Sequence, residues 1–238
     1  MACAHDSRLL LGAGAAVAGA AAYWLPAAAL ISGGVRRGLR VRATIDDAAA
    51  VSLTFDDGPH PEGTAAILAI LEAAGTPATF FLAGEQVERW PTIAADVVAA
   101  GHDIGVHCQR HRNLMRLTPQ QVRDDLRRAA DAIGRATGVA PRYYRPPYGI
   151  LTTPAVAFAR SRRWEVVLWK RDGADWSKRA TPETITTRVL RHAGGGDVLL
   201  LHDSDHYSAS DSWRRTARAL PAILQELQAG HLRVAPLD

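Results

Sequence analysis

Two adjacent aspartates, Asp56 and Asp57, stand in the segment TFDDGP (residues 54–59), directly after a short apolar run. Neighbouring carboxylates repel each other unless a cation or a basic group lies beside them. One of the two can therefore bind a metal while the other, turned differently, acts as a base. Asp-Gly is also a common turn dipeptide, so this segment by itself favours a polar turn.

A histidine pair, His107 and His111, lies in the segment HCQRH. Histidines at i and i+4 can share one face of a helical turn and chelate one metal. A lone pair is more often structural, but an aspartate at a strand end completes a two-histidine, one-carboxylate set, which leaves coordination positions open for water and substrate. Zinc is the expected ion, and such sites also accept cobalt, nickel or manganese.

Three further segments combine reactive side chains with rigid or buried surroundings. In RPPYG (145–149) two prolines fix the backbone directly after Arg145 in an extended form, which can aim a guanidinium at a carboxylate. DGADW (172–176) sets two acidic groups beside an indole, and LLLHD (199–203) ends an apolar run with His202. Each also fits a plainer interpretation, as a rigid surface loop, an exposed loop or a histidine at the core edge.

The elements that must position these side chains alternate between strands and helices. Apolar runs predict strands over 51–55, 78–82, 102–106, 143–145, 164–169 and 197–201. Helical spacing and two Thr-Pro starts predict helices over 64–74, 92–100, 118–137, from Thr181 onward, and over 213–229. This order predicts a mainly parallel sheet, and every reactive segment follows a strand, as in a β/α barrel whose active site forms at the carboxyl ends of the strands.

Together the five segments TFDDG, HCQRH, RPPYG, DGADW and LLLH resemble the signature of carbohydrate esterase family 4, the NodB-like polysaccharide deacetylases, in the family's order from Val51 to Leu201. The resemblance implies an α/β fold, a distorted and incomplete (β/α) barrel, and metal-dependent hydrolysis of an acetamide. We therefore expect a catalytic domain over 48–238, preceded over 1–47 by an apolar segment and a basic linker.

Carried over residue by residue, the resemblance implies that Asp57, His107 and His111 bind the metal. Asp56 would be the general base that activates water, and Arg145 would orient it.

The other side of the site would contain His202 as the general acid, paired with an aspartate of DGADW. Asp175 is preferred to Asp172 because it adjoins Trp176. The oxyanion site and the acetyl pocket would be completed by the Tyr148 backbone N–H and by the side chains of Trp176 and Leu200.

The second segment departs from the family at Cys108, where Ser or Thr is usual. The hydroxyl normally supports the loop, so the change puts loop rigidity and oxidation sensitivity in question more than activity. A thiol ligand to the metal and a disulfide with Cys3 are both disfavoured.

The expected reaction removes N-acetyl groups from amino sugars of a cell-envelope polysaccharide, either peptidoglycan or a chitin-like oligosaccharide. The alternatives are a deacylase of a lipid-linked sugar, an O-acetyl xylan esterase and a non-catalytic carbohydrate-binding relic. A relic would lack one of the acidic or histidine residues above, and all are present.

The N-terminal segment Leu9 to Ile31 contains no charged residue and is long enough to cross a bilayer. It predicts a signal-anchor helix or a cleaved signal peptide, with a buried alanine-rich helix as the alternative. Arginines 36, 37, 40 and 42 come directly after it, and the positive-inside rule would keep the C-terminal side of the segment in the cytoplasm. Envelope chemistry instead favours a membrane-anchored or secreted protein with an extracytoplasmic catalytic domain.

The charge distribution argues against a nucleic-acid partner. The formal net charge is +4 in 238 residues, and basic residues alternate with acidic ones along the helical stretches. We expect a monomer whose partner is an N-acetylated saccharide.

Overall fold

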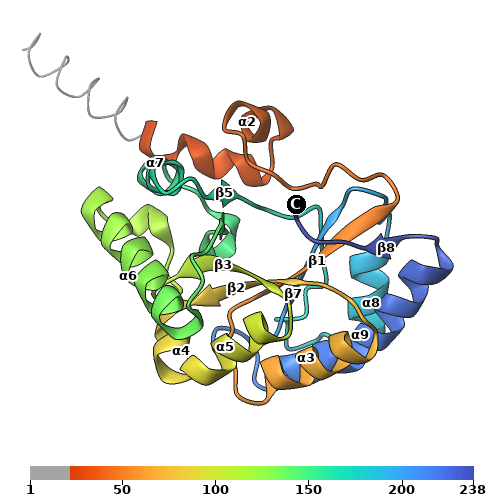
Figure 1. The fold of residues 1–238 in the computed structure, drawn as a ribbon. Helices are drawn as coiled ribbons and strands as arrows, with labels where there is room; N and C mark the ends of the chain where they lie inside the picture. Colours follow the sequence, from red (N-terminus) through yellow and green to blue (C-terminus); the bar gives the residue numbers. More distant parts are fainter. Residues whose placement is uncertain (1–21) are drawn as a thin grey trace, which may run out of the picture.

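A parallel β-sheet forms the centre of the computed structural model, which describes residues 22–238 (Figure 1). Its strands follow the order β5-β4-β3-β2-β1-β7-β6, and β8 pairs with the first residues of β1. Every pairing between these strands is parallel. The bounds are β1 Ala50–Asp56, β2 Thr79–Ala83, β3 Asp103–Cys108, β4 Tyr143–Tyr144, β5 Glu165–Val166, β6 Arg171–Asp172, β7 Val198–His202 and β8 Arg233–Val234.

Helices α3 to α6, α8 and α9 surround one side of the sheet, and η1 and α2 lie on the other (Figure 1). The α-helices are α2 Gly33–Gly38, α3 Gly63–Ala73, α4 Gly84–Arg89, α5 Pro91–Ala99, α6 Pro119–Thr137, α7 Thr153–Ser161, α8 Pro182–Leu190 and α9 Ser212–Ala229. Three short 3₁₀ helices complete the described chain: η1 Leu25–Leu30, η2 Leu114–Arg116 and η3 Pro147–Gly149.

Strand β1 occupies the middle of the sheet and is buried at every position. A strand covered on both faces needs a nearly continuous apolar run, which AVSLTF provides. Its register places Asp56 beside His202 of β7 and beside Phe81 of β2. The parallel register alone therefore brings residues 56 and 202 to the same edge of the sheet.

Helix α6 packs against β3, the strand that carries His107. Thr118 and Gln121 form a capping box at its start, and Gly138 ends it in the left-handed conformation with φ of 71°. Its buried face includes Val122, Leu126 and Ile133. Burial of this apolar face, more than intrinsic propensity, stabilises the helix.

The predicted incomplete parallel barrel is confirmed, with three local differences. The strand expected over 164–169 is limited to Glu165–Val166, because its partner β4 is only two residues long; the next residue, Val167, forms an isolated bridge with Arg42. Helices α4 and α7 were not predicted, since both are short; α4 contains a single large apolar residue, Val87, and the buried face of α7 consists mainly of the small side chains of Ala155 and Ala159. The backbone of residues 43 and 45 forms hydrogen bonds with Val198 and Gly196. Segment 42–45 therefore connects the end of β5 to the start of β7.

Most of the segment Leu9 to Ile31 lies outside the described residues. Its described end, from residue 22, contains a helical turn and the 3₁₀ helix Leu25–Leu30. Within residues 22–238, no helix has the length and apolarity that crossing a bilayer requires. The expected long apolar helix is therefore not among the observed elements.

Replacing Leu126 with alanine tests the contribution of α6. The side chain is fully buried, so we expect its truncation to lower the free energy of unfolding by about 2–5 kcal/mol. Urea denaturation measures this. Arg123→Ala, on the exposed face of the same helix, should change the free energy by less than about 0.5 kcal/mol. Equal effects of the two changes would contradict this packing.

Candidate active site

The reactive side chains converge at the carboxyl ends of β1, β3 and β7. They line a cavity of about 290 Å³. Eight of the ten residues singled out from the sequence line this cavity. The other two, Arg145 and Asp175, lie behind it and contact Asp56 and His202 respectively. The lining consists of Asp56, Asp57, His107, His111, Tyr148, Trp169, Trp176, Leu200, His202, Tyr207 and Ser208.

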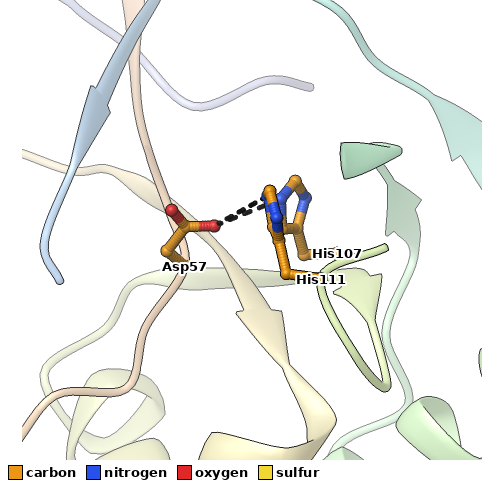
Figure 2. A group of neighbouring side chains, drawn as sticks. All are labelled: Asp57, His107 and His111. Atoms are coloured by element: carbon orange, nitrogen blue, oxygen red, sulfur yellow. Dashed lines mark ion pairs between the residues drawn. The ribbon is translucent and has the colours of Figure 1, made fainter. Parts of the chain in front are cut away.

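Asp57, His107 and His111 form a compact group of metal-ligand type (Figure 2). Oδ1 of Asp57 lies 3.3 Å from Nε2 of His107 and 3.5 Å from Nε2 of His111. One ligand atom from each residue lies within 4.8 Å of the others. Residues 57, 107 and 111 thus meet although Asp57 directly follows β1, His107 lies in β3 and His111 lies in the segment after β3.

The local backbone directs these side chains. Asp57 has φ of 79°, a left-handed conformation that turns the chain sharply after β1, so Asp56 and Asp57 reach different partners. Strands β2 and β3 pair Leu82 with Val106 and Ala83 with Cys108, so His107 is an extra residue in β3. A bulge of this kind redirects a side chain beside an active site.

Hydrogen-bonding roles show that this group fits a cation. Nδ1 of His107 lies 2.9 Å from the carbonyl oxygen of Arg145, which can only accept, so Nδ1 carries the proton. In the neutral ring, Nε2 of His107 is then an acceptor facing Oδ1 of Asp57. That oxygen is buried and makes no hydrogen bond within the described residues. Acceptors pointed at one another repel, and a divalent cation among them removes the conflict.

The protonation states agree with this fit. Burial alone would raise the pKa of Asp57, but the adjacent His107 and the charges of His202 and His111 lower it to about 2. Burial lowers the pKa of His111 to about 4, although Asp57 opposes this shift. At neutral pH the pair therefore offers a carboxylate and a neutral imidazole, the forms that bind a metal.

Asp56 is held by a fully buried arginine. The Nη1 atom of Arg145 donates to Oδ1 of Asp56 at 2.7 Å and to Oγ1 of Thr54 at 2.8 Å. The guanidinium also lies 4.0 Å from the ring centroid of Phe81. These contacts immobilise one carboxylate oxygen of Asp56 and leave the other available.

His202 is paired with Asp175. Its Nδ1 lies 2.8 Å from Oδ1 of Asp175, while Oδ2 of Asp175 accepts from the backbone N–H of His202 at 2.7 Å and from Thr216 at 2.8 Å. Burial alone would lower the pKa of His202, but the charge and hydrogen bond of Asp175 raise it to about 10. Asp172 instead forms an ion pair with Arg188.

A second cluster, His60, Asp205 and His206, also has metal-ligand spacing. Nδ1 of His60 accepts hydrogen bonds from the backbone N–H groups of Glu62 and Gly63, at 3.2 and 2.9 Å. The neutral ring therefore carries its proton on Nε2, which faces Asp205 Oδ1 at 3.4 Å. The Nε2–H group of His60 thus gives the Asp205 carboxylate a donor, and no ion is needed beside it. We therefore interpret the cluster as a contact between loops.

Comparison with known proteins agrees with the fold and with the family that the sequence resembles. The family model for polysaccharide deacetylases matches residues 44–167. A peptidoglycan-N-acetylglucosamine deacetylase from Bacillus cereus is 37% identical over 156 residues, which is 66% of this chain and 56% of that protein. A chitooligosaccharide deacetylase from Bradyrhizobium is 35% identical over 195 residues, which is 79% of this chain and 89% of that protein.

The chain belongs to the polysaccharide deacetylase family. A solved peptidoglycan N-acetylglucosamine deacetylase, in complex with an N-oxidanyl-benzamide, matches with a TM-score of 0.76 and 32% identity. That match covers 83% of this chain and 90% of the other. The chain spans little more than half the length of the Bacillus cereus relative.

The two histidines do not lie on one helical turn, which is one arrangement that their i, i+4 spacing allows. His107 lies in β3 and His111 in the irregular segment after it. Asp125 of α6 holds this segment, accepting from the backbone N–H of Gln109 at 2.7 Å and from Arg112 at 2.7 Å. Side-chain contacts to a distant helix, and not helical periodicity, thus set the position of His111.

Cys108, the departure from the polysaccharide deacetylase pattern, is a fully buried free thiol. Burial, together with the charges of Asp125 and Asp57, raises its pKa well above the ordinary value. The reactive thiolate is therefore disfavoured, which argues against oxidation sensitivity at this position. It is not part of the metal-ligand group among the described residues.

The cavity walls include residues that sequence reasoning missed. Trp169 and Tyr207 line it together with the expected Tyr148, Trp176 and Leu200. Trp169 ends a predicted strand and could have been found from that position. Tyr207 lies in a loop with no motif to mark it.

Asp203 is a further missed residue. It is fully buried beside Gly58, accepts a hydrogen bond from Thr64, and would collide with any side chain at position 58. Burial raises its pKa to about 7. Gly58 is therefore required in TFDDG by this contact.

Replacing Asp175 with asparagine should lower the pKa of His202, because burial then acts without the opposing charge. In the metal-free chain, an NMR titration of the His202 ring should shift downward by about one unit or more. The folded-state pKa of about 10 exceeds the ordinary 6.5, so the stability linked to this proton is complete below pH 6.5 and is lost as pH rises toward 10.

The control for this titration is Asp172→Asn, which alters contacts with Arg188 and with the backbone N–H of Ala174 and should leave the His202 pKa unchanged. An unshifted titration in Asp175→Asn would contradict the pairing.

Proposed function

We propose that this protein hydrolyses the N-acetyl group of an amino sugar in a cell-envelope polysaccharide, peptidoglycan or a chitin-like oligosaccharide, releasing acetate and a free amine. The observation that carries the proposal is the convergence of Asp57, His107 and His111 in one cavity, with Asp56 and His202 beside them. The names of the relatives support the substrate class, since they are deacetylases of N-acetylglucosamine in peptidoglycan and of chitooligosaccharides.

The metal ligands in this proposal are Asp57, His107 and His111, and the ion is zinc. Two neutral imidazoles and one carboxylate form a set that zinc prefers, with coordination positions left for other groups. When bound, such an ion polarises an acetyl carbonyl and lowers the pKa of a water molecule.

Asp56 acts as the general base. Arg145 binds its Oδ1 at 2.7 Å, which fixes the direction of the carboxylate. Asp56 then accepts a proton from the water molecule whose oxygen adds to the acetyl carbon. Arg145 is fully buried and is thus a positioning residue for Asp56.

His202 acts as the general acid. Asp175 fixes Nδ1, so Nε2 faces the cavity, 4.0 Å from Oδ2 of Asp57. The raised pKa of about 10 keeps His202 protonated at neutral pH. It donates that proton to the sugar nitrogen as the C–N bond breaks, because an amine leaves readily only when protonated.

The cavity walls accept the acetyl group. Leu200, 2% exposed, and Trp176, which lies edge-on to His202 with ring centroids 5.6 Å apart, contribute apolar surface to the cavity for the acetyl methyl group. Tyr148 lies at the exposed rim in a left-handed turn with φ of 59°, and its backbone N–H is assigned to the oxyanion. A donor of this kind contributes about 3 kcal/mol to transition-state stabilisation.

Single substitutions distinguish the residues that bind the metal from the residue that acts as the base. Asp56→Asn should retain the metal and lose about 10²- to 10⁴-fold in kcat, because the base is removed while the ligands remain. His107→Ala should lose both metal and activity. Metal analysis of the purified chains, together with acetate release, checks both results. Full activity in Asp56→Asn would refute the assignment of the base.

A substrate panel tests the reaction class. We expect acetate release from N-acetylglucosamine oligomers or peptidoglycan, loss of that release after chelation, and recovery on adding zinc. Acetylated xylan is the comparison substrate. Acetate from xylan alone would make the protein an O-acetyl esterase, and no acetate from any substrate would favour a carbohydrate-binding relic.

A further inference from the structure

The two histidines of the metal group are held in different ways. His107 has a hydrogen-bond partner behind it, the carbonyl oxygen of Arg145 at 2.9 Å from Nδ1. Nδ1 of His111 is buried and has no such partner among the described residues. A metal-binding histidine ordinarily uses its second nitrogen in a hydrogen bond that fixes the ring. The orientation of His111 must therefore be set by other contacts.

Two aromatic rings supply those contacts. The ring of Tyr207 stacks on the imidazole of His111, with centroids 4.6 Å apart and planes inclined by 15°. Tyr148 meets the same imidazole edge-on, with centroids 4.6 Å apart and planes inclined by 74°. Tyr148 is 54% exposed, whereas Tyr207 is only partly exposed and is held from behind. Tyr207 is thus the firmer of the two contacts.

Hydrogen bonds to the start of α4 fix the Tyr207 ring. Its hydroxyl donates to Oε1 of Glu85 at 2.6 Å and accepts from Nε2 of Gln86 at 3.0 Å. Burial and the Glu85 contact raise the pKa of Tyr207, so the hydroxyl remains a donor. The backbone N–H of Glu85 also donates to Gln109 O at 3.0 Å, within the segment that leads to His111.

We propose that Tyr207 is a positioning residue that holds the imidazole of His111 in the orientation required for metal binding. The stacked ring blocks rotation of the imidazole, which would carry Nε2 away from Asp57. The loop after β7 contains Tyr207 and begins at His202, so one segment supports the acid and the metal ligand. This inference rests on the metal site of the proposed function.

The test compares metal affinity in variants of the full chain. Tyr207→Phe keeps the stacking ring and loses only the hydroxyl contacts, so zinc affinity should fall by less than about threefold. Tyr207→Leu and Tyr207→Gln remove the aromatic face, and zinc affinity should fall by about 10- to 100-fold, as for loss of other groups that orient a metal ligand. Competition with a chromogenic chelator, without substrate, measures these affinities.

Matched variants distinguish the possible failures. Ser210→Ala changes an exposed residue of the same loop and should bind zinc like the native chain, while His111→Ala should bind it far more weakly. Circular dichroism and melting of the metal-free chains identify which of Tyr207→Leu and Tyr207→Gln remains folded, and the folded variant decides. Native zinc affinity in that variant would overturn the proposed role of Tyr207 but not the metal site. Failure of the native chain to bind zinc would overturn the metal site as well.

Discussion

Burial of carboxylates is the constraint on which this site depends. Four aspartates, at positions 56, 57, 175 and 203, are at most 3% exposed. An ionised carboxylate without compensation costs several kcal/mol inside a protein. Asp56 is compensated by Arg145 and Asp175 by His202, while the pKa of Asp203 is about 7, so protonation relieves part of its burial cost at neutral pH. Asp57 remains ionised and faces acceptor atoms. A cation bound beside it would offset the cost of burying its charge.

The fold brings these groups together by two simple means. The parallel register of β1 and β7 sets Asp56 beside His202, and the left-handed conformation of Asp57 turns the next carboxylate toward the histidines. Asp56 and His202 thus lie at the same edge of the sheet, and Asp57 and His111 reach this edge from the segments that follow β1 and β3. The turn at Asp57 therefore lets two consecutive aspartates contact different partners and take different roles.

The strands and the reactive segments could be predicted from the sequence because both depend on local patterns. Apolar runs mark β1 and β7, and the order of five short segments identifies the family. The loop of His111 could not be predicted correctly: its i, i+4 spacing fits a helix, but Asp125, sixteen residues beyond Gln109, holds the backbone otherwise. Tyr207 was missed for a similar reason, since its contacts with His111, Glu85 and Gln86 join residues about 100 positions apart.

X-ray absorption spectroscopy of the zinc-loaded chain tests the central claim most directly. The account predicts a single bound ion with two imidazole nitrogens at about 2.0–2.1 Å and oxygen donors completing the shell. The imidazole signal should be unchanged in His60→Ala and halved or lost in His111→Ala. A chain that binds no zinc, or one whose imidazole signal depends on His60 and His206 and not on His107 and His111, would contradict the account.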